Sequence, residues 1–194
     1  EESVRTNVHL SDLHFGRIHY DLAKPLAAVI QGLKPDLVAV SGDLTQRARP
    51  SECREARAFL DSLPQPQLVV PGNHDFDFGL PLLRRAGVEA TYHYVAANVD
   101  VTAGGSLFPA TVVLQRSGVR VGVTGFTTPG VMVWDRAQLA GQVRVRRVAE
   151  AAPAALAQLE REGANVKIVL IPAGLGGGSS YDPTGVGPEN DAAA

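Results

Sequence analysis

The stretch VVPGNHDFDFG, residues 69–79, decides how the chain folds, because a buried run ends there in a crowded polar turn. Two valines that close a predicted strand are followed by Pro71 and Gly72, which interrupt regular structure. The next residues supply an amide, an imidazole and two carboxylates: Asn73, His74, Asp75 and Asp77. The pattern predicts a strand whose carboxyl end carries a functional turn.

Further along the chain in both directions, short apolar runs alternate with helical patterns. Their near-continuous apolar character predicts strands covered on both faces. The strand-like runs span residues 6–12, 36–43, 67–73, 119–126 and 165–174. Apolar residues recur at helical spacing over residues 22–34, 51–63 and 150–163. Ser51 is the expected N-cap of the second helix, and Gly163 the expected stop of the third.

The order of strand, helix and strand predicts parallel pairing. One segment differs: residues 111–126 hold two strand-like runs around Ser117 and Gly118, which predicts a hairpin. The expected fold class is therefore α/β, with a mixed β-sheet flanked by helices. A length of 194 residues suits a single domain over residues 1–194.

Composition excludes several classes of partner. Eighteen basic and 20 acidic residues give a net charge of −2, which argues against nucleic-acid binding and against binding an anionic membrane. No apolar run approaches the roughly 20 residues that span a bilayer, and no signal peptide is recognisable, so we expect a soluble protein, either cytoplasmic or, as a processed fragment, periplasmic or secreted. Oligomeric state and compartment stay open. The basic cluster Arg144, Arg146 and Arg147 reads as the solvent face of an edge strand or as a phosphate-binding patch.

Metal-type ligands follow the first three predicted strands. Asp12 and His14 come first, Asp43 follows the second strand, and the turn at Asn73 follows the third. Because Asp12 and His14 are two positions apart, an extended segment would point both the same way. We expect all of these ligands to meet at one sheet edge, where Asp43 could bridge two ions about 3.5–4 Å apart.

The residues around these ligands indicate which ions they suit. Gly42 and Gly72 precede ligand positions, as is needed where the backbone turns sharply beside a site. Oxygen and imidazole ligands without cysteine suit Mn, Zn, Fe or Mg. The cofactors predicted are thus divalent metal ions, ideally two.

Three blocks carry a resemblance to a known family. SDLH (11–14), SGDLTQR (41–47) and PGNHD (71–75) resemble the D-x-H, G-D and G-N-H-[DE] blocks of the calcineurin-like metallophosphoesterases. The N-terminal part is most similar to cyclic-nucleotide phosphodiesterase-like and exonuclease-like members. The later stretches YVAANV, GVRVGVTGFTTPG and AGLGGGSSYD resemble the catalytic domain of secreted 5'-nucleotidases and 2',3'-cyclic-nucleotide phosphodiesterases. The resemblance implies a four-layer αββα sandwich.

The resemblance also implies a metal-ligand set. It places Asp12 and His14 on the first metal, Asp43 between the two metals, and Asn73 on the second. The reaction implied is attack on phosphorus by a metal-activated water. The substrate implied is a small-molecule phosphate ester, a nucleotide or cyclic nucleotide, as monoester or diester.

Two catalytic residues follow from the same resemblance. His74 would face the phosphate, and Asp77 would orient the His74 imidazole and fix its tautomer. Asp75 would support the turn that carries them.

The sequence departs from the family pattern in its last part. Pro172 stands where the resemblance leads us to expect a histidine, and no histidine follows His93, so a G-H-x-H block is missing and the domain is expected to be incomplete at its C-terminus. We therefore expect a weak second metal site and low activity. The alternative function is a non-catalytic metal-binding remnant or scaffold.

Four other features favour ordinary structural roles. His9 lies inside a predicted strand and reads as a core or partly buried histidine, while Cys53 reads as an inert thiol. Trp134 could stack on a nucleobase, although a packed loop is the simpler interpretation. The run GLGGGSS, residues 174–180, reads as a flexible loop rather than a phosphate loop.

Overall fold

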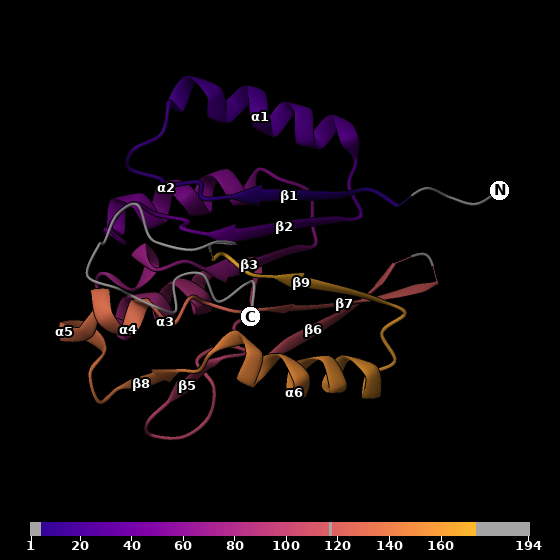
Figure 1. Cartoon of the computed structure of the whole chain (residues 1–194). Helices are drawn as coiled ribbons and strands as arrows, with labels where there is room; N and C mark the ends of the chain where they lie inside the picture. The colour runs from indigo at the N-terminus through magenta and orange to yellow at the C-terminus, as the bar shows by residue number, and fades with distance from the viewer. Residues whose placement is uncertain (1–4, 117, 174–194) are drawn as a thin grey trace.

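The fold is that of a computed structural model, which describes residues 5–116 and 118–173. Strands and helices alternate along most of the chain (Figure 1). The elements in order are β1 (Asn7–Ser11), α1 (Tyr20–Leu33), β2 (Leu37–Gly42), α2 (Pro50–Asp61), β3 (Gln67–Pro71), the 3-10 turn η1 (His74–Phe76), α3 (Leu80–Glu89), β4 (His93–Tyr94), β5 (Val99–Val101), β6 (Thr111–Arg116), β7 (Val119–Gly125), α4 (Val131–Trp134), α5 (Arg136–Leu139), β8 (Val143–Val145), α6 (Val148–Arg161) and β9 (Val166–Leu170). The run at 174–180 lies outside the described residues.

The first sheet brings the ligand-bearing turns to one edge. Its strand order is β1-β2-β3-β4 and every pairing is parallel. The register places Ser11 opposite Ser41, and Gly42 opposite Pro71. Because parallel strands end on the same side of a sheet, the turns after β1, β2 and β3 leave it side by side.

The second sheet contains the predicted hairpin. Strands β6 and β7 pair antiparallel, and β9 joins β7 in parallel, which gives the order β6-β7-β9. The mixed pairing predicted from residues 111–126 is therefore found in this sheet. A two-stranded antiparallel ribbon of β5 and β8 completes the described strands.

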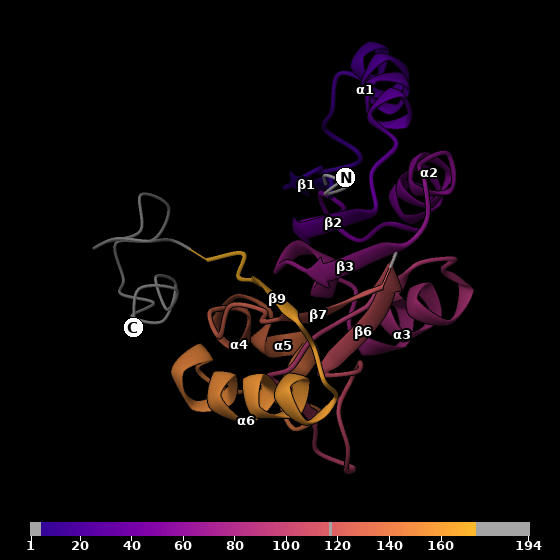
Figure 2. The same cartoon turned by 90° about the vertical axis from the view of Figure 1, so that its right-hand side faces the viewer.

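Three clusters of buried side chains define four layers. In β2, Val38 and Val40 pack toward the helices α1, α2 and α3, whereas Leu37 and Ala39 pack toward the second sheet. A third cluster joins Phe126 beyond β7 to α6. Figure 2 shows the two sheets stacked between α1 and α2 on one side and α6 on the other. The predicted α/β class with a sandwich flanked by helices is confirmed.

Several local predictions need correction. The outer strand β1 is not covered on both faces: Asn7, His9 and Ser11 are exposed, because β1 lies at the edge of its sheet. Ser51 is not the N-cap of α2. The helix begins one residue earlier at Pro50, whose fixed φ suits a first helical position, and Glu52 accepts the Arg47 and Arg49 amides instead.

Other local predictions are confirmed. Gly163 has φ +71° just past the end of α6, as expected of a helix stop. The thiol of Cys53 has a pKa raised to about 11, chiefly by burial, which makes it inert. Strand β8 carries an exposed Arg144, while Arg146 donates from Nε to Asp100 at 2.7 Å.

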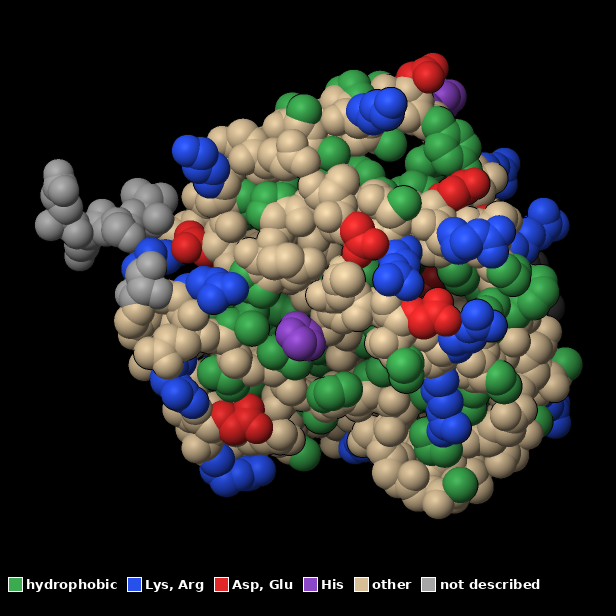
Figure 3. All heavy atoms as spheres, turned by 180° about the vertical axis from the view of Figure 1, so that it is seen from behind, with side chains coloured by type: hydrophobic (Ala, Val, Ile, Leu, Met, Phe, Trp, Pro, Cys, Tyr) green, Lys and Arg blue, Asp and Glu red, His purple; other side chains and the backbone are tan. Residues whose placement is uncertain are grey.

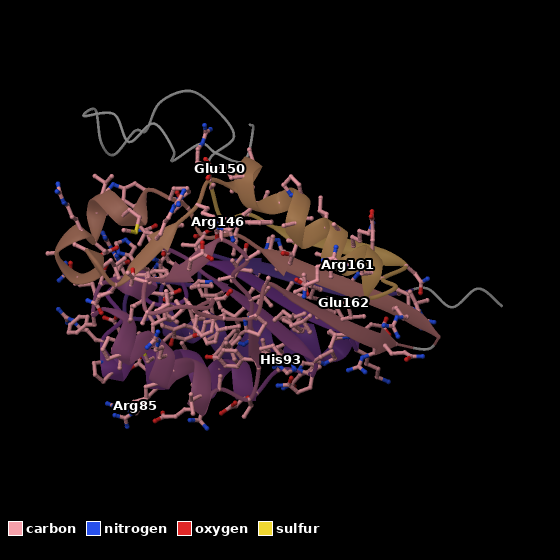
Figure 4. The ribbon with its side chains drawn as sticks, turned by 90° about the horizontal axis from the view of Figure 1, so that it is seen from below. Arg85, His93, Arg146, Glu150, Arg161 and Glu162 are labelled. Atoms are coloured by element: carbon pink, nitrogen blue, oxygen red, sulfur yellow. The ribbon has the colours of Figure 1, made fainter. Side chains whose placement is uncertain are left out.

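The surface does not concentrate charge of one sign on the face drawn in Figure 3, where acidic and basic side chains are interspersed. Figure 4 shows Arg146 and Glu150 near one end of α6 and Arg161 with Glu162 near the other, with Arg85 on the opposite layer. Among the described residues, no helix has the length and hydropathy to cross a membrane.

Candidate active site at the strand ends

Backbone hydrogen bonds to the end of β2 hold the turn after β1, which is not an extended segment. Asp12 and His14 have φ of +52° and +47°, so the segment is not extended as predicted. Both lie in the left-handed region, which few residues other than glycine adopt. The Asp12 amide donates to the Ser41 carbonyl at 3.0 Å, and the His14 amide donates to the Asp43 carbonyl at 2.9 Å. These bonds fix both side chains beside the end of β2.

Two glycines allow the turns to approach each other closely. A Cβ at Gly42 would lie 2.2 Å from Asp12 Oδ1, and a Cβ at Gly72 would lie 2.2 Å from Asp43 Oδ1. Gly42 also has φ +82°. Each carboxylate thus occupies the space of a missing side chain on the next strand, and the expected sharp turn of the backbone is found at Gly42.

Asp12, His14 and Asp43 converge. Each offers one ligand atom, and these atoms lie within 4.8 Å of one another. His14 Nε2 is 3.9 Å from Asp43 Oδ2, while His14 Nδ1 is buried without a hydrogen-bond partner. Two carboxylates and an imidazole with an unpartnered nitrogen form a donor set that fits a divalent cation.

The pKa values of Asp43 and His14 also indicate that this cluster would favour a bound cation. Burial raises the pKa of Asp43 to about 6, and the neighbouring charges of Asp12 and Asp77 add to the rise. Burial likewise lowers the pKa of His14, which favours the neutral imidazole that binds metals. A divalent ion would offset the crowded negative charge.

Asp75 holds the ends of β2 and β3 together, as expected of a residue that supports the turn. Its two oxygens accept from the Leu44, Thr45 and Gly72 amides and from the Thr45 hydroxyl, at 2.9 to 3.2 Å. It is buried. Burial and the charge of Asp43 raise its pKa to about 7 against these hydrogen bonds.

His74 and Asp77 form a pair beside the ligand cluster. His74 Nδ1 lies 3.3 Å from Asp77 Oδ2, and the His74 amide donates to Asp43 Oδ1 at 2.8 Å. The His74 ring is 5.8 Å, centroid to centroid, from the His14 ring. The contact with Asp77 fixes the orientation of the His74 ring.

A cavity of about 370 Å³ adjoins the cluster. Asn73 lies in its wall beside Asp12, and Pro172 lines it as well. A proline side chain offers no ligand atom, so Pro172 adds no donor to this wall. The full lining is His9, Ser11, Asp12, Ser41, Asn73, Thr128, Trp134, Ile171, Pro172 and Ala173.

Two of these lining residues correct the sequence interpretation. His9 is exposed rather than in the core, and its Nε2 lies 2.8 Å from Ser41 Oγ. Trp134 is the last residue of the short helix α4 and packs over Gly130. The sequence predicts a packed loop at this position instead. Asp135, which does not line this cavity and which the sequence did not single out, is buried near Asp77. The alternation of His9 and Ser11 with apolar residues could have revealed that His9 is exposed. No sequence pattern marks Asp135.

The first sheet places acidic and imidazole side chains at its parallel strand ends, the edge where ligand sites of open α/β sheets lie. The family model described as calcineurin-like phosphoesterase matches residues 7–183. The chain belongs to this family, which confirms the resemblance seen in the three sequence blocks.

Curated proteins that are named as nucleotide enzymes are similar to this chain in sequence. A 2',3'-cyclic-nucleotide 2'-phosphodiesterase/3'-nucleotidase of Salmonella typhimurium is 28% identical over 207 residues, covering 89% of this chain and 31% of the relative. A Yersinia enterocolitica protein of the same name is 37% identical over 129 residues, covering 61% of this chain and 19% of the relative. The chain thus spans a third or less of the length of these relatives.

Solved structures share the fold. The calcineurin-like phosphoesterase YfkN from Bacillus subtilis matches with a TM-score of 0.75 at 25% identity, covering 91% of this chain and 64% of that one. A 5'-nucleotidase precursor from Thermus thermophilus matches with a TM-score of 0.73 at 25% identity, covering 88% and 37%.

Proposed function

We propose that this chain hydrolyses phosphate esters of nucleotides or cyclic nucleotides with the help of divalent cations. The observation that carries the proposal is the convergence of Asp12, His14 and Asp43 within 4.8 Å at neighbouring strand ends. The names of the Salmonella and Yersinia relatives support nucleotides as the substrate class.

The ligands divide into a stronger and a weaker set. Asp12, His14 and Asp43 would hold the first cation, while Asp43 and Asn73 alone would hold a second. When bound, such cations activate water for in-line attack on phosphorus and neutralise charge on the phosphoryl oxygens. We expect the second cation to bind weakly, because one of its two protein ligands is shared and the other is a neutral amide.

His74 would act on the leaving group. Its Nδ1 is held by Asp77, so Nε2 is the nitrogen that would donate to the leaving oxygen as the ester bond breaks. The Asp77 carboxylate fixes the tautomer and stabilises the imidazolium form that serves as the acid. The His74 amide, bonded to Asp43, ties this acid to the ligand cluster.

A second candidate function is supported by Pro172. This residue lines the cavity beside Asp12 and Asn73 without offering a ligand, so the chain could bind one cation and serve as a non-catalytic scaffold. The two functions differ in turnover, whereas both require the first cation site.

Calorimetric titration with Mn²⁺ and turnover of two chromogenic substrates, bis(4-nitrophenyl) phosphate and 4-nitrophenyl phosphate, separate the candidates. The enzyme predicts Mn²⁺-dependent turnover that Asp43→Ala abolishes, while the distant Asp36→Asn leaves it intact. The scaffold predicts Mn²⁺ binding without turnover. Absence of Mn²⁺ binding would contradict both. The ratio of diester to monoester turnover then assigns the preferred ester.

A further inference from the structure

A buried carboxyl group lies behind the His74–Asp77 pair. Asp135 sits between α4 and α5 and is only 5% exposed. It occupies the N-cap position of α5, yet its side chain makes no capping hydrogen bond. The Gln138 amide, at the third helical position that such a cap would serve, donates to the Asp135 backbone carbonyl instead. The ordinary helix-capping role therefore does not explain this side chain.

The environment of the Asp135 side chain is unusual for a carboxylate. Its Oδ2 is buried and has no donor within hydrogen-bonding distance. An ionised carboxylate in such a place would be strongly destabilising, because each buried lone pair without a donor carries a desolvation penalty. A protonated carboxyl group removes this conflict, provided that an acceptor is near.

That acceptor is Asp77. The pKa of Asp135 is raised to about 7, first by burial and then by the charge of Asp77 and a side-chain hydrogen bond with it. Packing agrees, since a Cβ at Gly79, two residues beyond Asp77, would lie 3.9 Å from the Gln138 Cβ on α5. Helix α5 thus lies against the turn that carries Asp77.

We propose that Asp135 is a positioning residue, which holds the Asp77 carboxylate in the orientation that receives His74 Nδ1. The protonated Asp135 donates its O–H to Asp77, and Asp77 accepts a second hydrogen bond from the His74 imidazole. Asp135 touches no reacting atom. Its effect on catalysis passes through Asp77 and His74, and so rests on the proposed function.

The three side chains of this arrangement satisfy one another's hydrogen bonds without any other group. Asp135 contributes one O–H, His74 contributes one Nδ1–H, and the single carboxylate of Asp77 accepts both. Two carboxyl groups in contact share one proton in this way, because both cannot ionise at close range. Asp77 then has no freedom to rotate away from the imidazole.

Substitutions at Asp135 test the hydrogen bond rather than the charge. Asp135→Asn keeps a donor toward Asp77, whereas Asp135→Leu removes it and fills the same volume. Arg136→Ala, at an exposed position of the same helix, is the matched control. For a nucleotide substrate with a poor leaving group, we expect Asp135→Leu to lower kcat by about tenfold or more with little change in KM. Asp135→Asn should restore most of that loss.

The leaving group distinguishes positioning from a merely structural effect. Loss with the 4-nitrophenyl esters should be much smaller, because 4-nitrophenolate departs without a proton. Asp77→Leu should show the same selectivity, and the double variant should lose little more than either single variant. Equal losses with both leaving groups, or additive losses in the double variant, would overturn the proposal.

A measurement without turnover keeps the inference separate from the proposed function. Long-range ¹H–¹⁵N spectra of the metal-free chain report which His74 nitrogen carries the proton. We expect one fixed state with Nδ1 protonated in the wild type, Asp135→Asn and Arg136→Ala, and mixed tautomers in Asp135→Leu. An unchanged His74 pattern in Asp135→Leu would refute the role of Asp135 even in an active enzyme. A wild type without turnover but with this pattern would refute only the proposed function.

Discussion

At the scale of one residue, the site depends on the lack of a side chain at Gly72. The Asp43 carboxylate and the Asp43 amide occupy the space where a side chain on Gly72 would begin, at 2.2 and 2.5 Å from an ideal Cβ. Contacts this short involve backbone as well as side chain, so they are not relieved by rotating Asp43 alone. The position therefore controls where a ligand carboxylate can lie.

Gly72→Ala should therefore displace Asp43 and weaken cation binding. We expect Mn²⁺ affinity to fall by about tenfold or more, since one of three ligands leaves its place. Calorimetric titration measures this. Gly32→Ala is the control, because nothing lies within 4 Å of its Cβ in α1; it should leave affinity unchanged and stabilise the fold by about 0.5–1 kcal/mol. Equal affinity in both variants would show that Asp43 does not need this space.

Asp75 offers a second test at this scale. Asp75→Asn replaces one accepting oxygen by an amide NH₂, which would face backbone donors from Leu44 and Gly72 or from Thr45. Leaving buried donors unpaired destabilises the fold, here by about 2–4 kcal/mol. Urea unfolding of the metal-free protein measures the change, with Asp21→Asn at an exposed position of α1 as reference. A variant as stable as the wild type would mean that these bonds contribute little.

The two sheets meet closely where β3 crosses β7. A Cβ at Gly125 would lie 2.1 Å from Val70 Cγ2, so the valine side chain fills the space left by the glycine. The Gly125 carbonyl also accepts the Ala97 amide at 2.8 Å. This contact sets the spacing between the layers just before the ends of the strands.

Gly125→Ala should accordingly push the sheets apart and destabilise the fold by about 1–3 kcal/mol, the usual range for overpacking. Val70→Ala alone should also destabilise it, because it leaves a cavity. The double variant should recover part of both losses, giving a coupling of about 0.5 kcal/mol or more in urea unfolding. Strict additivity would indicate that the two residues do not compete for one space.

The elements differ in how far sequence reveals them. Strands β2 and β3 and helix α6 were predicted within a few residues, because their apolar periodicity follows from burial on known faces. Strands β4 and β5 have only two or three residues and carry no period of their own. Tertiary contacts alone define them. Helix α3 escaped prediction since its few buried positions, Leu80 and Leu83, follow directly on the polar turn.

The site was predictable to the same extent as the sheet that carries it. Asp12, His14 and Asp43 were expected together because parallel strands end at one edge, and the structure brings them together. Their left-handed backbone was not expected, since the alternation of Asp12 and His14 favoured an extended segment. Asp135 joins the site through the packing of α5, which no local pattern announces.

At the scale of the whole molecule, several acidic side chains are buried, which the net charge of −2 does not reveal. Asp43, Asp75 and Asp135 are all buried, with pKa values raised to about 6, 7 and 7. Raised pKa values mean that the folded protein binds protons more tightly than the unfolded chain. Their contribution to stability is complete below pH of about 4 and is lost as pH rises through these values.

The metal-free protein should therefore lose thermal stability between pH 5 and pH 8. With a chelator present, we expect Tm to fall by an amount on the order of 5 °C over this range. Excess Mn²⁺ should raise Tm most at pH 8, because the cation competes with protons for the carboxylates. Differential scanning calorimetry at both pH values measures this. A chelated Tm that rises with pH would contradict the assignment of buried acids.

The bonds that tie the Asp12 and His14 amides to carbonyls of the neighbouring strand have a further consequence. The ligand cluster inherits its shape from the alignment of β1 with β2, rather than from the chemistry of the side chains alone. A slip of β1 by one residue would scatter the cluster while every acid and imidazole stayed in the sequence. Strand register is in this protein a determinant of cation affinity.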